Sequence, residues 1–350
     1  MQKSALFVPP PVSRILPWFP KHQQNTLRLL RDGIHHVDLV LEVRDARIPL
    51  SSANAQFQEV LGRRERIIVF NKQDLANQNM TQTLASTLTK ETSDKFIFAC
   101  SKSKTGGIHS SVKRVMAMLV EKAKANQQRM HDMSIVVVGL PNVGKSSIIN
   151  ALRNVGTNKG KASQVANFAG VTRAIQTKVK IHSDPNIYLV DTPGVLNPQV
   201  KSPIQGLRVA LVGCTKDNLS DEIAIAEYLL FRLNQSKVAI QSYASLLALD
   251  APATQIHPLL MSVVAAGRAQ RVPQSSSMAE AAHVFISLFR KGAFGPLTLD
   301  DCSPEGMAEL LAEIVGAGVE GGAGVVTPGR DLSMQREGLN GRILYSLENE

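Results

Sequence analysis

One segment of eight residues has the spacing of a phosphate-binding loop. Residues 139–146 match G-x-x-x-x-G-K-[ST] and lie between a strand pattern and a helix pattern. The glycines let the backbone wrap closely around phosphate oxygens, and the amides with the following helix N-terminus attract their charge. We expect Lys145 to reach the β- and γ-phosphates and the Ser146 hydroxyl to hold Mg²⁺. The other residues expected to bind nucleotide here are Asn142, Val143, Gly144 and Ser147.

A second segment, Asn71-Lys72-Gln73-Asp74, indicates which base is bound. A carboxylate here accepts hydrogen bonds from guanine N1–H and the 2-amino group, a donor pair that adenine lacks, so we expect Asp74 to read guanine. Asn71 would support the base and loop geometry, and Lys72 would lie along the base with its aliphatic stem. Ser101-Lys102, after the next predicted strand, would complete the base pocket through backbone amides. The alternative for that dipeptide is an ordinary strand-to-helix turn.

Two further segments have residue types suited to sensing a γ-phosphate. Asp191-Thr192-Pro193-Gly194 ends a predicted strand; the Asp191 carboxylate would hold Mg²⁺, and the Gly194 amide would contact the γ-phosphate. Thr172 lies between this segment and the phosphate loop and can offer a hydroxyl and a carbonyl to Mg²⁺. Together with Lys145, Thr172 and Gly194 are the expected catalytic residues.

The residue after Gly194 is Val195, where Ras-like enzymes carry a glutamine that orients the attacking water. Valine cannot do this, so we expect slow intrinsic hydrolysis that is stimulated from elsewhere. Asn142 is a candidate K⁺ ligand, because GTPases with G-x-P-N-x-G-K-[ST] often hold K⁺ near the β- and γ-phosphates with this side chain. The alternative is that Asn142 only shapes the loop.

The elements that must position these segments alternate between strand and helix, which predicts an α/β P-loop GTPase domain with a mostly parallel sheet and helices on both faces. After about residue 200 only helical periods remain, which predicts a C-terminal all-α domain. The expected domains are a basic leader (1–20), a GTPase domain (21–202), an RNA- or ribosome-binding helical domain (203–315) and a flexible tail (316–350). Strands are predicted over 37–43, 66–70, 95–100, 134–139, 177–182 and 187–190, helices over 24–36, 81–90, 108–128, 145–153, 221–233, 258–266, 278–290 and 304–315, and a mobile loop over 154–170.

Composition limits the partners and the compartment. The 350 residues carry a formal charge of +10, which favours an anionic partner such as RNA or a membrane surface, although many basic proteins bind no polymer. Three cysteines without a CxxC pair argue against a disulfide framework or a zinc site and fit a reducing compartment. No apolar run approaches the roughly 20 residues of a membrane span. Residues 1–31 lack Asp and Glu, which is typical of a mitochondrial transit peptide or of a disordered basic tail.

The order of the motifs along the chain differs from that of Ras-like GTPases. The guanine segment precedes the phosphate loop, and Asp45-Ala46-Arg47-Ile48-Pro49 stands upstream of both. This arrangement resembles the circularly permuted GTPases of the YlqF/YawG group, and most closely the mitochondrial ribosome-associated GTPase 1 family. Trp18-Phe19-Pro20-Lys21-His22 is similar to the group's W-F-P-G-H-M, with Lys21 in place of Gly, and residues 289–292 are similar to its late F-R-x-G. The resemblance covers roughly residues 17–301.

The resemblance implies an assembly factor for the large subunit of the mitochondrial ribosome that binds rRNA in a nucleotide-dependent way. It implies GTP/GDP and Mg²⁺ as ligands, a mitochondrial matrix location with peripheral association to the inner membrane, and a monomeric chain. We further expect γ-phosphate contacts at Gly194 to bias the orientation of residues 205–315. The alternatives are a nucleolar or cytoplasmic ribosome-assembly GTPase, a GTP-binding scaffold with little turnover, and a signalling switch or RNA-modification enzyme.

Overall fold

The computed structural model describes residues 9, 37–53, 60, 64–91, 94–101, 110–125, 132–156, 165–166, 178–191, 200, 202–215 and 221–308. Several expectations fall outside these residues: the helix over 24–36, the tryptophan-containing segment 18–22, and most of the loop over 154–170. The part of that loop that is described differs from the expectation, because residues 154–156 continue a helix and residues 165–166 form a short strand.

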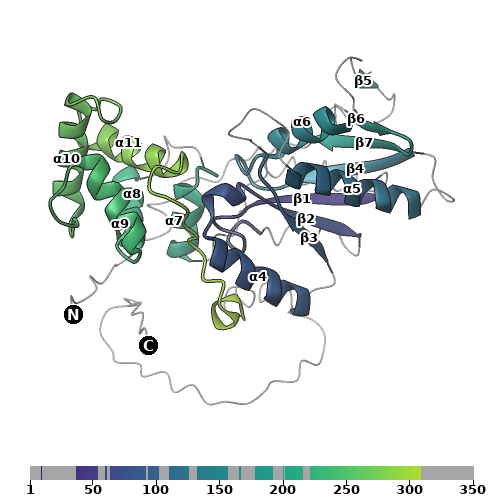
Figure 1. Ribbon diagram of the computed structural model, residues 1–350, viewed down its shortest axis with the longest axis horizontal. Coiled ribbons are helices and arrows are strands. Elements are labelled where there is room, and N and C mark those ends of the chain that lie inside the picture. The colour runs from purple at the N-terminus through teal and green to yellow at the C-terminus, as the bar shows by residue number, and fades with distance from the viewer. Residues whose placement is uncertain are drawn as a thin grey trace, which may run out of the picture.

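A seven-stranded sheet forms the first part of the molecule, in the order β3-β2-β1-β4-β7-β6-β5 (Figure 1). The pairs β1/β2, β2/β3, β1/β4 and β4/β7 are parallel, and β6/β7 and β5/β6 are antiparallel. The expected mostly parallel sheet is therefore confirmed. The strands are β1 (Leu39–Asp45), β2 (Arg66–Asn71), β3 (Lys95–Phe98), β4 (Asp132–Val138), β5 (Val165–Ala166), β6 (Lys178–Ser183) and β7 (Asn186–Asp191).

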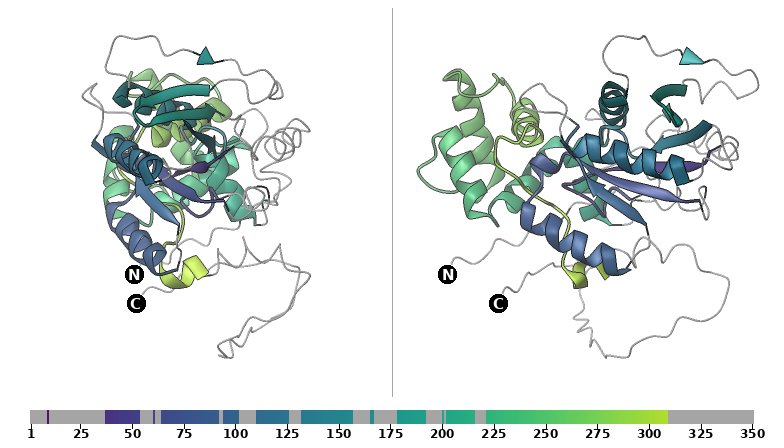
Figure 2. Two further views of the ribbon diagram at one scale, coloured as in Figure 1. Left: turned by 90° about the vertical axis from the view of Figure 1, so that its right-hand side faces the viewer. Right: turned by 45° about the vertical axis from the view of Figure 1, so that its right-hand side comes forward.

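Helices cover both faces of this sheet, as expected, because the parallel strands are apolar on both sides. Alternate residues of β2 point in opposite directions. Ile67 and Val69 join a hydrophobic cluster with α5 (Ser110–Ala125) and α6 (Lys145–Gly156). Ile68 and Phe70 join a second cluster with α4 (Gln78–Glu91). Figure 2 shows α4 and α5 on opposite sides of the sheet.

Residues 203–290, called the helical part below, contain α7 (Pro203–Leu211), α8 (Glu222–Leu233), α9 (Lys237–Leu247), α10 (Ile256–Arg268) and α11 (Met278–Arg290). The helices expected over 221–233, 258–266 and 278–290 are confirmed as α8, α10 and α11. The sequence reading missed α7 and α9, although each begins with a capping serine, Ser202 and Ser236, whose side chain accepts a backbone N–H. None of the helices among the described residues is long and apolar enough to span a membrane.

The helical part and the sheet share one hydrophobic core. A single cluster of buried residues runs from Leu41 of β1 through Leu207 of α7 to Phe285 of α11. Beyond α11 the chain returns to the sheet, and residues 296–308 are called the strap below (Figure 1). The helix expected over 304–315 is seen at its beginning, since residues 304–308 are helical and the remainder lies outside the description.

Backbone and side-chain bonds tie the strap to loops of the sheet. The Leu297 amide donates to the Leu75 carbonyl at 3.0 Å, and the Leu299 amide donates to the Arg47 carbonyl at 2.8 Å. The fully buried Asp300 accepts from the amides of Leu50 and Ser51, each at 2.8 Å. The strap, which the sequence analysis assigned to the helical domain (203–315), therefore packs on the sheet.

Candidate nucleotide-binding site

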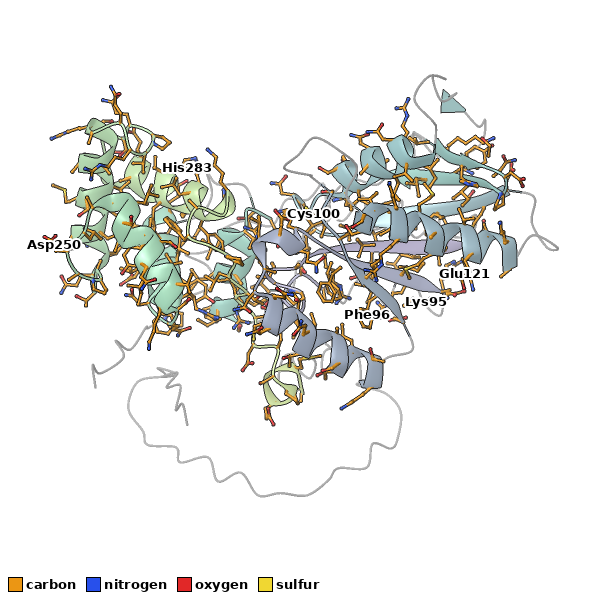
Figure 3. All side chains as sticks on the ribbon, in the orientation of Figure 1. Lys95, Phe96, Cys100, Glu121, Asp250 and His283 are labelled. Carbon is orange, nitrogen blue, oxygen red and sulfur yellow. The ribbon has the colours of Figure 1, made fainter. Side chains whose placement is uncertain are left out.

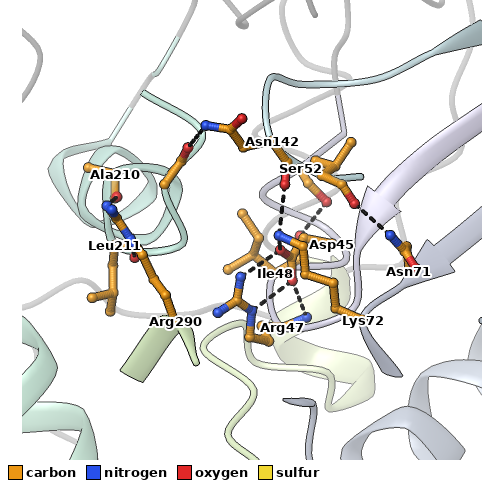
Figure 4. A network of polar contacts seen from close by, with 12 residues as sticks. Asp45, Arg47, Ile48, Ser52, Asn71, Lys72, Asn142, Ala210, Leu211 and Arg290 are labelled. Carbon is orange, nitrogen blue, oxygen red and sulfur yellow. Dashed lines mark hydrogen bonds and ion pairs between the residues drawn. The ribbon is translucent and has the colours of Figure 1, made fainter. Parts of the chain in front are cut away.

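The predicted phosphate loop and the predicted guanine loop lie side by side at the carboxyl edge of the sheet. The phosphate loop (139–146) follows β4, the guanine loop (71–74) begins at the end of β2, and β1 lies between these strands. Asn71 Nδ2 donates to the Val143 carbonyl at 2.9 Å, and Lys72 Nζ donates to the Asn142 carbonyl at 2.8 Å (Figure 4). The two loops are therefore bonded directly to each other.

The backbone of the phosphate loop requires glycine at two positions. Gly139 has φ +149°, and a Cβ there would lie 2.2 Å from the Val43 carbonyl oxygen. Gly144 has φ +101°, and a Cβ there would lie 2.2 Å from Asn71 Nδ2. The second glycine is thus required both by the loop conformation and by the close approach of the guanine loop.

Lys145 and Ser146 begin α6, where the helix N-terminus favours an anion. Lys145 is 7% exposed, and its ammonium donates to the carbonyls of Gly139 at 3.2 Å and Leu140 at 2.9 Å. The amine thus lies against the loop in which a phosphate would sit.

A cavity of about 670 Å³ opens beside both loops, large enough for a nucleotide. Its lining includes nine of the residues predicted from sequence to bind the nucleotide: Asn71, Lys72, Asp74, Ser101, Asn142, Gly144, Lys145, Ser146 and Ser147. Val143 is fully buried and contributes its carbonyl to Asn71.

The base end of the cavity is organised by the ends of β2 and β3. The Ser101 amide donates to Asn71 Oδ1 at 3.1 Å, so Asn71 joins the guanine loop to both neighbouring loops. Cys100 lies at the end of β3 nearest the helical part (Figure 3), and its thiol donates to Asp74 Oδ1 at 3.1 Å. The predicted guanine-reading carboxylate is thereby held in one orientation by a side chain that the sequence reading assigned no role.

We predict that replacing Cys100 with alanine weakens GDP binding roughly 2- to 10-fold, because the carboxylate loses a neutral hydrogen bond that orients it. Cys100→Ser keeps a donor at the same position and is expected to bind within about twofold of the unmodified protein. Fluorescence titration with a labelled GDP measures both constants. Equal losses in the two variants would show that the thiol acts by packing alone.

The opposite wall of the cavity comes from the helical part, and sequence reasoning did not assign it to the site. It consists of residues after α7 and at the end of α11: Val212, Gly213, Arg290 and Lys291. Asn142 Nδ2 donates to the Gly213 carbonyl at 2.7 Å (Figure 4). The Arg290 guanidinium donates to the carbonyls of Ala210 and Leu211, each at 2.9 Å. The only sequence signal for this wall was the similarity of residues 289–292 to F-R-x-G.

Asp45 and Arg47 form a buried ion pair beneath the loops. Arg47 Nε and Nη2 donate to the two Asp45 oxygens at 2.9 and 2.8 Å, and both side chains are almost fully buried. Lys72 Nζ donates to the same carboxylate at 2.8 Å. Burial alone would raise the pKa of Asp45, but the charges of Arg47 and Lys72 outweigh burial and hold that pKa well below its usual range. Arg47 also lines the cavity.

The predicted magnesium ligands are placed only in part. Ser146 lies in the first turn of α6, and the backbone of Asp191 ends β7, paired in register with Val137 two residues before the phosphate loop. Serine and aspartate are residue types whose side-chain oxygens Mg²⁺ prefers, so the chemistry of the predicted donor set fits the ion. Lys102, Thr172 and Gly194 lie outside the described residues.

Comparison with known proteins gives consistent relatives over most of the chain. A family described as "50S ribosome-binding GTPase" matches residues 134–255. The chain is 36% identical over 306 residues to mitochondrial GTPase 1 of Aedes aegypti, covering 83% of this chain and 96% of the relative. It is 35% identical over 300 residues to mitochondrial ribosome-associated GTPase 1 of Xenopus tropicalis, covering 81% and 94%.

A solved structure agrees with the architecture. The GDP-bound structure of TM YlqF superimposes with a TM-score of 0.50 at 20% sequence identity, covering 79% of this chain and 99% of that one. At this identity the likeness concerns the fold alone.

Proposed function

This chain belongs to the mitochondrial ribosome-associated GTPase 1 family, and from that premise we propose that it hydrolyses GTP while assisting assembly of the large subunit of the mitochondrial ribosome. The names of the relatives support a ribosomal partner and a mitochondrial location. The charge of +10 supports binding to rRNA, and the acid-free residues 1–31 support mitochondrial import. A matrix location, peripheral contact with the inner membrane and a monomeric state are parts of the same proposal.

The observation that carries the proposal is the bond between Asn142 and Gly213. Through it the phosphate loop is joined directly to the helical part, which also supplies one wall of the cavity. A ligand that draws the Asn142 amide toward the β- and γ-phosphates removes this bond from the end of α7. The nucleotide state would then alter how the helical part is held, and so its fit to rRNA.

Asn142 has two proposed uses, which involve different atoms of its side-chain amide. One is the bond from its Nδ2 to the Gly213 carbonyl, and the other is K⁺ coordination by its Oδ1 in the GTP-bound state, as the phosphate-loop sequence suggests. Asn142 has φ 58° and is exposed. Stimulation of hydrolysis by K⁺ over Na⁺ would support the second use.

The proposed chemistry rests on positioning and charge. Lys145 would leave the Gly139 and Leu140 carbonyls to contact the β- and γ-phosphates. When bound, Mg²⁺ supplies neutralisation of charge on the phosphate oxygens, and Ser146, Asp191 and Thr172 are the residues we propose to hold it. Gly194 would contact the γ-phosphate, and Val195 leaves the orientation of water to an external group.

We expect the protein to sediment with the large mitochondrial subunit on sucrose gradients in the presence of a non-hydrolysable GTP analogue, and to release it with GDP. Asn142→Gly tolerates the left-handed backbone and deletes the amide, so we expect this variant to lose most of the difference between nucleotides. Its affinity for GDP, measured separately, serves as the control for an intact phosphate loop.

Two results would contradict different parts of this proposal. Absence of the protein from all ribosomal particles would contradict the assembly role. Equal particle affinity with GDP and with the GTP analogue would contradict nucleotide gating while leaving the assembly role standing. A fusion lacking residues 1–31 that remains outside mitochondria would support the location, whereas nucleolar accumulation of the full chain would favour the nucleolar alternative.

A further inference from the structure

Asp45 is a fully buried carboxylate directly below the two nucleotide loops. It is the last residue of β1 and is paired in register with Asn71, the first residue of the guanine loop. Its Oδ1 accepts from the amide and Nε of Arg47, at 3.0 and 2.9 Å. Its Oδ2 accepts from Arg47 Nη2 and Lys72 Nζ, each at 2.8 Å. The carboxylate therefore has two cationic partners, although Arg47 alone already provides a two-pronged pair.

Lys72 is the partner that connects this pair to the cavity. Its backbone has φ 61°, and its side chain remains 24% exposed, so nothing about burial alone fixes its amine. The amine donates at 2.8 Å to Asp45 and at 2.8 Å to the Asn142 carbonyl of the phosphate loop. The lysine amine thus bridges a buried carboxylate at the end of β1 and the phosphate loop, and Lys72 itself lines the cavity.

Arg47 links the same carboxylate to the helical part. Its guanidinium lies over the Phe289 ring of α11, with 5.4 Å from Cζ to the ring centroid. Its carbonyl accepts the Leu299 amide of the strap. The position of Asp45 is therefore fixed from the helical side by Arg47, and Asp45 in turn fixes Lys72.

From this geometry we propose that Asp45 is a positioning residue for GTP and GDP: it holds the Lys72 amine on the phosphate loop, and so keeps the guanine loop and the phosphate loop at the separation that a guanine nucleotide spans. Arg47 is the support that holds Asp45 in place. The proposal rests on the assignment of residues 71–74 as the guanine loop. Asp45 itself is fully buried and is not one of the residues that line the cavity.

The test compares guanine nucleotides, which contact both the guanine loop and the phosphate loop, with a ligand that contacts the phosphate loop alone. Asp45→Asn removes the charge with little change of shape, and we expect it to weaken GDP and GTP about tenfold. Inorganic pyrophosphate contacts the phosphate loop alone, and we expect its affinity to change less than about twofold. A general collapse of the site would weaken pyrophosphate and GDP together, and this outcome would overturn the proposal.

A double-mutant cycle tests whether Asp45 acts through Lys72. We expect Lys72→Met to weaken GDP to a similar degree, and Asp45→Asn in that background to cause little further loss. If the loss of GDP affinity in the double variant equals the product of the two single losses, the residues act independently, and this result would overturn the proposal. Asp45→Glu keeps the charge but shifts the carboxylate, and provides the same comparison if Asp45→Asn does not fold.

Asp38→Asn is the matched control, since Asp38 directly precedes the other end of β1 and accepts a bond from the Ser134 amide. It is expected to leave GDP affinity unchanged. A parallel titration with ADP separates two kinds of failure. If the unmodified protein binds ADP as tightly as GDP, the guanine-loop assignment fails; if it prefers GDP but the cycle is multiplicative, only the role of Asp45 fails.

Discussion

Replacing Lys145 with methionine is expected to lower the rate of GTP hydrolysis roughly 100- to 1,000-fold. Charge builds up on the phosphate oxygens during transfer, and the lysine at the start of α6 is the cation that the phosphate loop places closest to them. Methionine has a similar length and fills the same buried space, but it carries no charge. Phosphate release measured under single-turnover conditions reports the change.

Two measurements separate loss of catalysis from loss of fold in this variant. The amine donates to two loop carbonyls, and water can replace these bonds, so the thermal unfolding temperature should fall by only a few degrees. Lys237→Met, at the exposed beginning of α9, is the control and should hydrolyse GTP normally. A decrease of less than threefold in Lys145→Met would remove Lys145 from the catalytic residues.

Asp300→Ala is expected to lower the free energy of unfolding by about 3–5 kcal/mol. Its carboxylate is fully buried, accepts two backbone amides and the Ser51 hydroxyl, and pairs with Arg208 at 3.3 Å. Removing it takes away the side-chain acceptor of two backbone amides and the carboxylate that pairs with the Arg208 guanidinium. Urea unfolding followed by circular dichroism measures the difference.

The neighbouring residue provides the control. Asp301 is exposed, and its carboxylate accepts the Ser303 amide at 2.9 Å. Asp301→Ala should therefore cost at most about 1 kcal/mol, the usual net value of one exposed hydrogen bond. Similar losses in the two variants would mean that the strap contributes little to stability through Asp300.

Much of the sheet part could be predicted because its signals are local. Apolar runs such as RIIVF mark buried parallel strands, and a glycine-rich loop between a strand and a helix has few other uses. The edge of the sheet where the loops meet follows from the parallel arrangement itself. Prediction was also right on the fold class, since motif order is read directly from the sequence.

The second wall of the cavity could not be predicted, because it depends on packing between distant segments. Gly213 and Arg290 lie about 70 and 145 residues beyond the phosphate loop, and neither has a residue type that identifies it as part of a nucleotide site. The role of Asp45 depends on its burial with Arg47 and Lys72, which no local pattern contains. α7 differs, because the sequence does contain a local signal for it: a capping serine, Ser202, followed by a proline at the first helical position.

The strap makes assembly of the nucleotide site a late event. The bonds that seat it, from Asp300 to Ser51 and from Leu299 to Arg47, join residues about 250 positions apart. Such distant contacts form slowly, because closing a long loop costs conformational entropy before the contacts contribute any stabilising free energy. A chain emerging at roughly 5–20 residues per second must wait tens of seconds between making the loop after β1 and making the segment that secures it. During that interval the guanine loop lacks the contacts that the strap makes with the neighbouring residues. GTP or a chaperone that binds early would therefore bind, and stabilise, an incomplete site.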